Sequence, residues 1–256
     1  MKLLKRLVLV ALAIGMTGSM ALAQQEQVGQ IAEFVGTATV ARAGGSQALG
    51  LDAPIYQNDT IETQSGTVLL ITFVDGTNLS MSSNAAMTID EMVYSPGASD
   101  NSALFSLTTG LFVLVSGDAA RSGDMVVSTP VSTIGIRGTA VAIKAAREEI
   151  ENTITLLRDP NGNDGLVEVS NELVSAVLQV LGDSVTLTRR DTPKLTVRKM
   201  SPAQMAKLFG SALAIMQRHT NSNLGADQAT FDDLSADDAA DLQLLFLDLF
   251  KEASAE

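Results

Sequence analysis

One loop of the chain carries side chains of the type and spacing that bind calcium. Asp159, Asn161 and Asn163 stand at the positions of the first three oxygen ligands of a helix-loop-helix calcium site. The glycine required at the sixth position is replaced by Asp164, and the bidentate glutamate of the twelfth position by Ser170. Asp, Asn and Gly also form turns for purely local reasons. We therefore interpret the loop as a turn, predict no metal site, and keep these three residues as the single calcium candidate.

Residues suited to nucleophilic or acid–base catalysis are few. The chain has no cysteine, and its one histidine, His219, is expected near the end of a helix, where it tempers the negative helix end. No Ser-His-acid arrangement and no glycine-rich phosphate loop is apparent. The acidic pairs Asp232-Asp233 and Asp237-Asp238 lie near expected helix starts, where capping or solvated roles are common. We predict that the protein is not an enzyme and needs no cofactor.

Arg137 is the only charged residue between positions 125 and 142. A buried charge without a partner is very unfavourable, so an arginine in such an apolar stretch is expected to bind backbone carbonyls and one internal acid. Asp59 and Asp75 are both plausible partners, and the sequence does not choose between them. The alternative is that Arg137 contacts an anionic ligand or a carboxylate of a partner. We interpret it as a structural staple.

The stretch around Arg137, residues 128–143, predicts two β-strands that meet at a bend. Proline biases the residue before it towards extended backbone, so Thr129-Pro130 leads into the first strand. Gly135 is expected on the strand face opposite the isoleucines. Gly138 is expected to allow a bend, a bulge or a close backbone approach.

From residue 28 to about residue 190 the sequence is a succession of short β-type runs separated by turn-forming residues. Residues 68–74 are almost continuously apolar, as in a strand covered on both faces. Asp75-Gly76 predicts a hairpin, and residues 104–107 and 111–115 predict two strands across Thr109-Gly110. The expected fold is mainly β, with a sandwich or solenoid-like body of short, mostly antiparallel strands.

Composition changes near residue 200, and residues 200–256 predict a C-terminal α-helical hairpin. Ser201 is an N-cap with proline at the first helical position and Gln204 three residues after the cap. A second helix is expected to begin after Ser235. The expected apolar stripes are Met205, Leu208, Leu213 (or Ala212) and Met216 on the first helix, and Leu242, Leu245, Phe246 and Leu249 on the second.

The first 23 residues have the parts of a secretory signal peptide. Three basic residues precede an apolar run, and Ala21-Leu22-Ala23 forms a small-x-small cleavage site. The run is shorter than the roughly 20 residues of a spanning helix. We predict cleavage after Ala23, a periplasmic or secreted location, and no stable membrane insertion. Because the chain lacks cysteine, a lipid anchor on an N-terminal cysteine is excluded.

The net charge of the chain limits the classes of molecule that it is expected to bind. Cleavage leaves 14 of the 17 basic residues against 29 acidic ones, a net charge of about −15. Nucleic acids and anionic lipids are bound by clusters of Lys and Arg. We therefore exclude nucleic acid as a partner.

With strands and turns laid out, the chain resembles the FecR-like domain, a family named for the periplasmic regulator of ferric-dicitrate signalling. Its recurring elements are a Gly-Asp-x-Ile-x-Thr segment, an Asp-Gly hairpin, and a Thr-Pro segment running into Arg-Gly-Thr. Asn58 stands where the family usually has glycine. The resemblance covers roughly residues 60–169, and the matching residues are Asp59, Thr63, Asp75, Gly76, Thr129, Pro130, Arg137, Gly138 and Thr139.

This resemblance implies an all-β periplasmic domain, over residues 28–190, that binds other proteins rather than performing chemistry. Relatives that control sigma factors carry a cytoplasmic N-terminal segment and a spanning helix, whereas six residues precede the apolar run here. We therefore expect a non-enzymatic, exported protein-interaction module in cell-envelope sensing, signalling or assembly. The alternative is an extracellular protein that binds glycan or matrix in adhesion.

Overall fold

The computed structural model describes residues 26–42, 45–158 and 165–223. The predicted signal peptide, the calcium candidate loop and the predicted second C-terminal helix all fall outside these residues. The described part of the chain contains 17 strands, the short helix α2 (Ala119–Ser122) and the long helix α3 (Pro202–Asn223). The prediction of a mainly β protein with a helical C-terminal element is confirmed.

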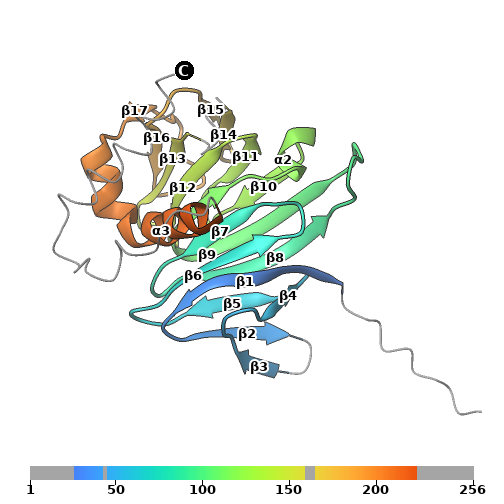
Figure 1. Ribbon diagram of the computed structural model, residues 1–256. Helices are drawn as coiled ribbons and strands as arrows, with labels where there is room; N and C mark the ends of the chain where they lie inside the picture. Colours follow the sequence, from blue (N-terminus) through green and yellow to red (C-terminus); the bar gives the residue numbers. More distant parts are fainter. Residues whose placement is uncertain (1–25, 43–44, 159–164, 224–256) are drawn as a thin grey trace, which may run out of the picture.

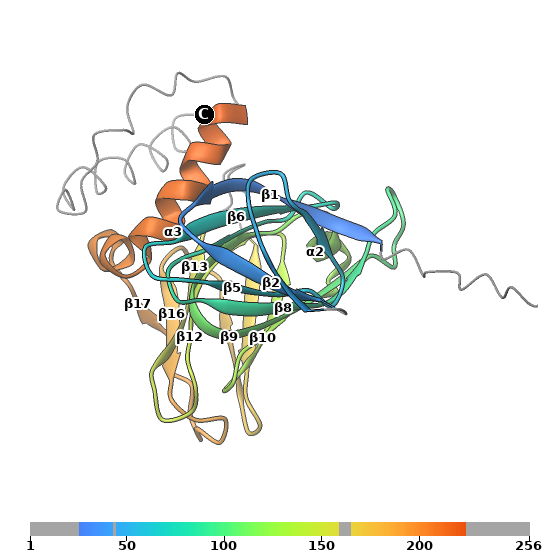
Figure 2. The same ribbon diagram turned by 90° about the horizontal axis from the view of Figure 1, so that it is seen from below.

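The strands form two sheets that pack face to face (Figures 1 and 2). In order across the first, sheet A, lie β4 (Pro54–Tyr56), β1 (Gln27–Val35), β6 (Val68–Phe73), β7 (Asn78–Met81), the second half of β9 (Ser102–Val115), β12 (Ala140–Ala145), β13 (Asn152–Leu157), β16 (Asp183–Leu187) and β17 (Arg198–Lys199). In order across the second, sheet B, lie β3 (Gly45–Ala48), β2 (Ala38–Arg42), β5 (Thr60–Thr63), β8 (Ala86–Val93), the first half of β9, β10 (Met125–Ser128), β11 (Thr133–Arg137), β14 (Leu166–Ser170) and β15 (Ser175–Leu178). Among these pairs only β9–β10 is parallel.

Strand β9 belongs to both sheets. Residues 102–109 pair with β8 and β10 in sheet B, and residues 110–115 pair with β7 and β12 in sheet A. The change of sheet occurs at Gly110, whose φ of +118° favours glycine. A Cβ at this position would lie 2.3 Å from the Cβ of Ala85. The prediction of two strands across Thr109-Gly110 is therefore wrong, because the glycine bends one continuous strand instead of ending it.

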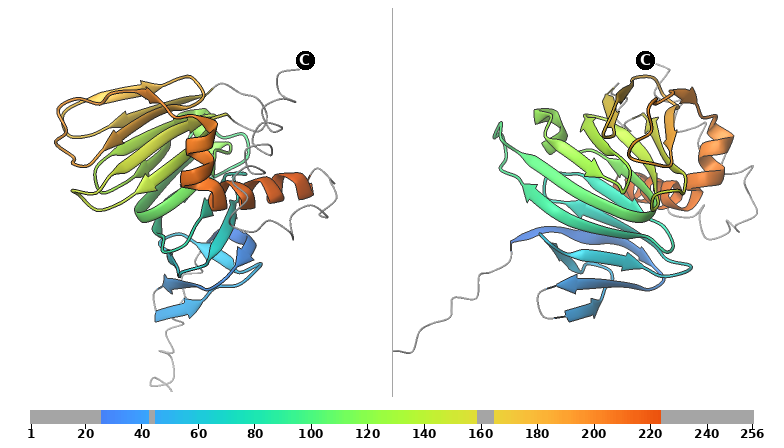
Figure 3. Two further views of the ribbon diagram at one scale, coloured as in Figure 1. Left: turned by 90° about the vertical axis from the view of Figure 1, so that its left-hand side faces the viewer. Right: turned by 180° about the vertical axis from the view of Figure 1, so that it is seen from behind.

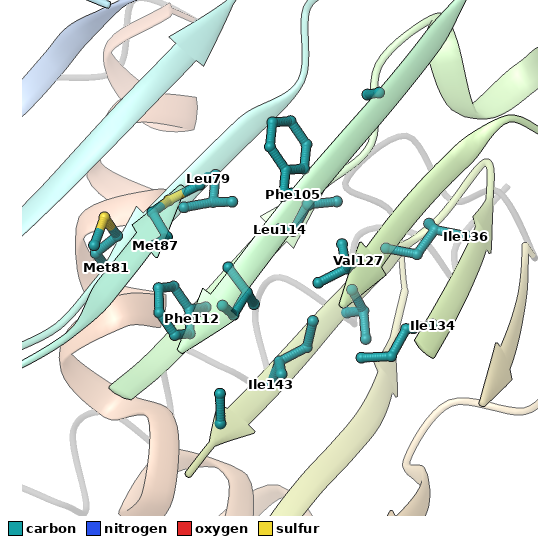
Figure 4. Close-up of a cluster of buried hydrophobic side chains, with 14 of the residues drawn as sticks. Leu79, Met81, Met87, Phe105, Phe112, Leu114, Val127, Ile134, Ile136 and Ile143 are labelled. Carbon is teal, nitrogen blue, oxygen red and sulfur yellow. The ribbon is translucent and has the colours of Figure 1, made fainter. Parts of the chain in front are cut away.

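The main hydrophobic core lies between the two sheets. Inward-facing side chains alternate with outward-facing ones along most strands, as the two-residue period of a half-buried strand requires. Figure 4 shows ten of them: Leu79, Met81, Phe112, Leu114 and Ile143 from sheet A, and Met87, Phe105, Val127, Ile134 and Ile136 from sheet B. None of the ten is more than 1% exposed, so these side chains form the centre of the core between the two sheets.

A second core lies between sheet A and α3. Leu69, Leu70 and Ile71 of β6 are all fully buried, which confirms the prediction of a strand covered on both faces. Leu70 faces the helix, where it packs in a cluster with Phe209. The helix bends along its length (Figure 3), and a Gly-Ser pair, a common cause of bends, lies in its middle.

The start and the buried face of α3 follow the sequence closely. The backbone N–H of Ser201 donates to the side chain of Gln204 (2.8 Å), and the N–H of Gln204 donates to the Ser201 hydroxyl (3.3 Å). This reciprocal pair is the predicted capping box. Of the predicted stripe, Met205, Ala212 and Met216 are buried, with Leu208 and Leu213 half-buried beside Phe209 and Ile215. In the described part of the chain, no helix has the length and apolarity needed to cross a membrane.

Candidate functional site

The residues of the sequence motif lie mostly at turns, and the first of them, Asp59, is fully buried. Its carboxylate accepts hydrogen bonds from Nε and Nη2 of Arg42, at 2.7 and 2.8 Å, and from the N–H of Tyr56 at 2.9 Å. Arg42 also donates to the carbonyl of Pro54 and stacks over the Tyr56 ring, 4.6 Å from its centroid. This cluster ties β2, β4 and β5 together. Asn58, with φ of +67°, adopts the left-handed conformation that suits Gly or Asn.

Thr63 joins the end of β5 to the turn that precedes β8. Its hydroxyl donates to the carbonyl of Ser82 at 2.6 Å and accepts the N–H of Ala85 at 2.8 Å. The side chain is buried, so both hydrogen bonds are shielded from water. The role of this threonine is therefore to fix a turn.

Asp75 performs the same task in the hairpin between β6 and β7. Its carboxylate accepts from the N–H and hydroxyl of Thr77, at 2.9 and 2.8 Å, and from the N–H of Ala119 at 3.2 Å. Gly76, with φ of +85°, completes the turn. The hydroxyl of Thr77 accepts the N–H of Gly117 at 2.9 Å. The hairpin is thereby attached to the start of α2.

The Thr-Pro segment lies at the end of sheet B, between β10 and β11. The hydroxyl of Thr129 accepts the N–H of Ser132 at 3.0 Å, which closes the turn. The carbonyl of Pro130 accepts Nη2 of Arg190 at 3.0 Å. Beside them is an open hollow of about 300 Å³ that Thr133 also lines.

Gly138 and Thr139 carry the chain from sheet B to sheet A. Gly138 has φ of +60°, so the predicted bend is present. The hydroxyl of buried Thr139 donates to the carbonyl of Leu157 at 3.0 Å, and its N–H donates to the hydroxyl of Ser116 at 2.9 Å. These bonds fix β12 beside β13 and the end of β9.

The structure contradicts the interpretation of Arg137 as a staple. Its side chain is exposed on β11, where Thr133, Gly135 and Arg137 face outward and Ile134 and Ile136 face the core. The two acids expected as partners bind elsewhere, Asp59 to Arg42 and Asp75 to Thr77 and Ala119. The prediction failed because successive side chains of a strand point to opposite faces. The isoleucines beside Arg137 in the sequence face the core, whereas Arg137 itself faces solvent. The arginine that does act as a staple, Arg42, was missed, and a buried aspartate that requires a cation was its only signal.

The outer face of sheet B carries a row of hydroxyl side chains that the sequence did not reveal. One residue from each of the nine strands stands in register with its neighbours. Eight of the nine are serine or threonine, and none is charged. From edge to edge they are Ser46, Ala41, Thr60, Thr88, Ser106, Ser128, Thr133, Ser170 and Ser175.

We name these nine residues the hydroxyl row. At a strand spacing of about 4.8 Å it extends about 38 Å. All its members are exposed or half-exposed, and the hydroxyls of Thr60 and Thr88 are hydrogen-bonded at 3.0 Å. Among the described residues, the long helix α3 packs on the outer face of sheet A, the sheet that does not carry the row (Figure 3). The row is visible only once the register of all nine strands is known.

The described residues contain no group of three or more His, Cys, Asp or Glu side chains that could hold a metal ion. Near the end of α3, Nδ1 of His219 lies 3.8 Å from a carboxylate oxygen of Glu33 on β1. His219 therefore contacts sheet A as well as lying near the helix end, where the sequence predicts it.

Comparison with solved structures gives distant matches. Two belong to a "putative anti-sigma factor" from Parabacteroides distasonis ATCC 8503, each 14% identical. One has a TM-score of 0.44 and covers 63% of this chain and 74% of that one, and the other has a TM-score of 0.42 and covers 56% and 60%. A "Cell surface anchoring domain" is 29% identical over 24% of this chain and 82% of that one, with a TM-score of 0.23. No curated protein matches the chain.

Comparison with protein families gives a match that coincides with the motif. Residues 59–157 match the family described as FecR protein. The match begins at Asp59 and includes Asp75 and Thr139, whose hydrogen bonds fix the turns of the sandwich. It ends at Leu157, the last residue of β13, twelve residues short of the expected limit of residue 169. Strands β1–β4 before the match and β14–β17 after it complete the two sheets. The part of the chain that matches the FecR family is therefore residues 59–157.

Proposed function

We propose that this protein is a non-enzymatic regulatory module of the bacterial cell envelope that binds a protein partner through the outer face of sheet B. The hydroxyl row is the observation that carries the proposal. The family match supports a regulatory role, because residues 59–157 of the chain match FecR protein. Residues 1–23 of the chain, which resemble a signal peptide, support a periplasmic or secreted location.

The side chains of the hydroxyl row are well suited to a protein interface. Serine and threonine lose little side-chain entropy when they are immobilised, unlike lysine and glutamate. A hydroxyl both donates and accepts, so it adapts to either kind of group on a partner. No charged group has to be desolvated along the row. A partner with a flat, hydrogen-bonding surface fits this face.

Breadth is a second feature of the face that favours a protein over a small ligand. A length of about 38 Å along the row matches an interface that buries about 800 Å² on each partner. Small ligands occupy concave, mostly apolar pockets, whereas most of the row lies on an open sheet surface, with one open hollow of about 300 Å³ beside Ser128 and Thr133.

The proposal is tested by crosslinking and affinity capture of the full chain from its native envelope. Ser106→Arg and Thr133→Arg place a large cation on the row, at a half-exposed and an exposed position. We expect each to reduce capture of the partner at least about tenfold, with an unchanged melting temperature. Ser65→Arg, in an exposed turn between β5 and β6, is the matched control. Its capture should equal that of the unmodified chain.

Two results would contradict the proposal. If both row variants captured the same proteins as the control, the face would not be the interface. If no protein were captured and the chain bound purified glycans at low micromolar concentration, the extracellular glycan-binding alternative would replace it.

A further inference from the structure

A hollow of about 440 Å³ lies on the other side of the molecule, beside the first turn of α3. Figure 1 shows the start of this helix next to β16 and β17. Ser184 and Thr186 of β16 form part of its lining, and the segment that leads from sheet A into α3 forms its wall. This hollow is separate from the hydroxyl row, which lies on sheet B.

The wall of the hollow is basic, although the whole chain is strongly acidic. Lys194, Arg198 and Lys199 all line it, in a chain with 17 basic and 29 acidic residues. Glu151 also lines it, but its carboxylate already lies 3.5 Å from the ammonium of Lys144. The hollow therefore has an excess of positive charge.

Of the three cations, only Lys199 has an ion-pair partner among the described residues. Lys199 lies 2.8 Å from the carboxylate of Asp183 and donates to the carbonyl of Leu181 at 3.0 Å. Lys194 and Arg198 are exposed, and within the described residues neither forms an ion pair. Two cations are thus available to a ligand.

The remaining polar groups indicate the chemistry of that ligand. Besides the cations, the lining offers the hydroxyls of Ser184, Thr186 and Thr196. Ammonium and guanidinium groups only donate hydrogen bonds, and they bind carboxylates more strongly than neutral acceptors. The hollow is therefore suited to a ligand that carries several carboxylates.

The chain itself contains such a sequence. Residues 227–241 include six aspartates and no lysine or arginine. They begin four residues after Asn223, where α3 ends. A helix of 22 residues is about 33 Å long, and the 12 residues from position 224 to position 235, which precede the second expected helix, span up to about 40 Å when extended. The acidic segment is therefore long enough to return along α3 to the hollow.

We propose that the basic hollow binds a carboxylate-rich peptide, and that residues 227–241 of the same chain are this peptide. Because the segment is tethered, its effective concentration at the hollow is in the millimolar range. Binding depends on charge, so it weakens as salt shortens the screening length to about 3 Å at 1 M. An acidic partner protein competes with the segment for the hollow.

The test uses a carbodiimide, which joins an amine to a carboxylate in direct contact, on the dilute full-length chain. We expect mass spectrometry to find links from Lys194 to the aspartates of residues 227–241, independent of protein concentration and lost in 1 M salt. Arg198→Glu should reduce their yield at least about fivefold, because it reverses a charge beside Lys194. Lys207→Glu makes the same charge change on the exposed side of α3 and should leave the yield unchanged.

Three results would overturn the proposal. The first is that Lys194 becomes linked only to residues outside 227–241. The second is that the yield of the link to residues 227–241 is equal in the Arg198→Glu and Lys207→Glu variants. The third is loss of the link in about 10 mM inorganic phosphate at constant ionic strength, which would identify the site as one for small anions. A synthetic peptide of residues 227–241 should compete with the intrachain link and itself become joined to Lys194. A peptide that is joined while no intrachain link forms would show that the acidic ligand comes from another molecule.

Discussion

Asp59, the first residue of the FecR match, and Arg42 on β2 form a two-point ion pair with nitrogen–oxygen distances of 2.7 and 2.8 Å. The carboxylate is fully buried and the arginine side chain is 15% exposed. Asp59 is the first residue of the family match, whereas Arg42 lies 17 positions earlier and outside it. The buried acid of the motif is therefore neutralised by a residue that the motif does not contain.

Removing the charge of Asp59 should destabilise the protein strongly. Asp59→Asn leaves the guanidinium of Arg42 partly buried without its counter-charge, and breaking such a pair costs about 3–5 kcal/mol. We expect the free energy of unfolding, measured by urea denaturation, to fall by about 3 kcal/mol. Arg42→Lys keeps the charge but loses the two-point geometry, and its loss should be smaller. An unchanged midpoint for Asp59→Asn would show that the pair does not stabilise the fold.

Arg137→Ala should leave stability almost unchanged. The side chain is exposed, and exposed substitutions usually change the free energy of unfolding by less than about 0.5 kcal/mol. Thermal denaturation of the variant beside Asp59→Asn separates the two roles. A loss of several kcal/mol for Arg137→Ala would restore the staple interpretation.

Gly110→Ala should disrupt the point where β9 changes sheets. The new Cβ would lie 2.3 Å from that of Ala85, and the backbone has φ of +118°. Strain and overpacking together should cost about 2–4 kcal/mol in the free energy of unfolding. Gly135→Ala is the matched control, because a Cβ there meets nothing within 4 Å. It should be neutral or stabilising by about 0.5 kcal/mol.

Phe209 is expected to be the main anchor of α3. It is fully buried against sheet A, whereas its neighbour Leu208 is only partly buried. Phe209→Ala should cost about 3–5 kcal/mol in urea denaturation, and Leu208→Ala clearly less. Equal losses for the two variants would show that the helix contributes little through its buried face.

Asp183 should make stability depend on pH in the acid range. Partial burial acts to raise the pKa of Asp183, but hydrogen bonds from Lys199 and from the N–H groups of Val180 and Gln179 outweigh it and hold the pKa below the ordinary 3.8. A carboxyl group with a lowered folded-state pKa stabilises the protein above its unfolded-state pKa, and this contribution is lost as pH falls through the folded-state value.

Thermal denaturation of Asp183→Asn and the unmodified chain between pH 2 and pH 7 tests this dependence. The unmodified chain should melt at the higher temperature at pH 6, and the difference should shrink as the pH falls below 3.8. A difference that stays constant down to pH 2 would contradict the assigned ionisation.

Features that depend on neighbouring residues could be predicted from the sequence. The capping box of Ser201 and Gln204 is one, because both partners lie in a single helical turn. The burial of β6 on both faces is another, since its apolar run is continuous. The fold class and the FecR motif follow from the same local patterns of alternation and turns.

Only the tertiary structure decided which distant residues meet. It showed that Asp59 pairs with Arg42 instead of Arg137. Successive side chains of a strand point to opposite faces, so Arg137 is exposed although its neighbours in the sequence are buried. It also showed that Gly110 bends a strand rather than ending it. The hydroxyl row required the register of nine strands, and register is a property of pairing between distant segments that no single strand contains.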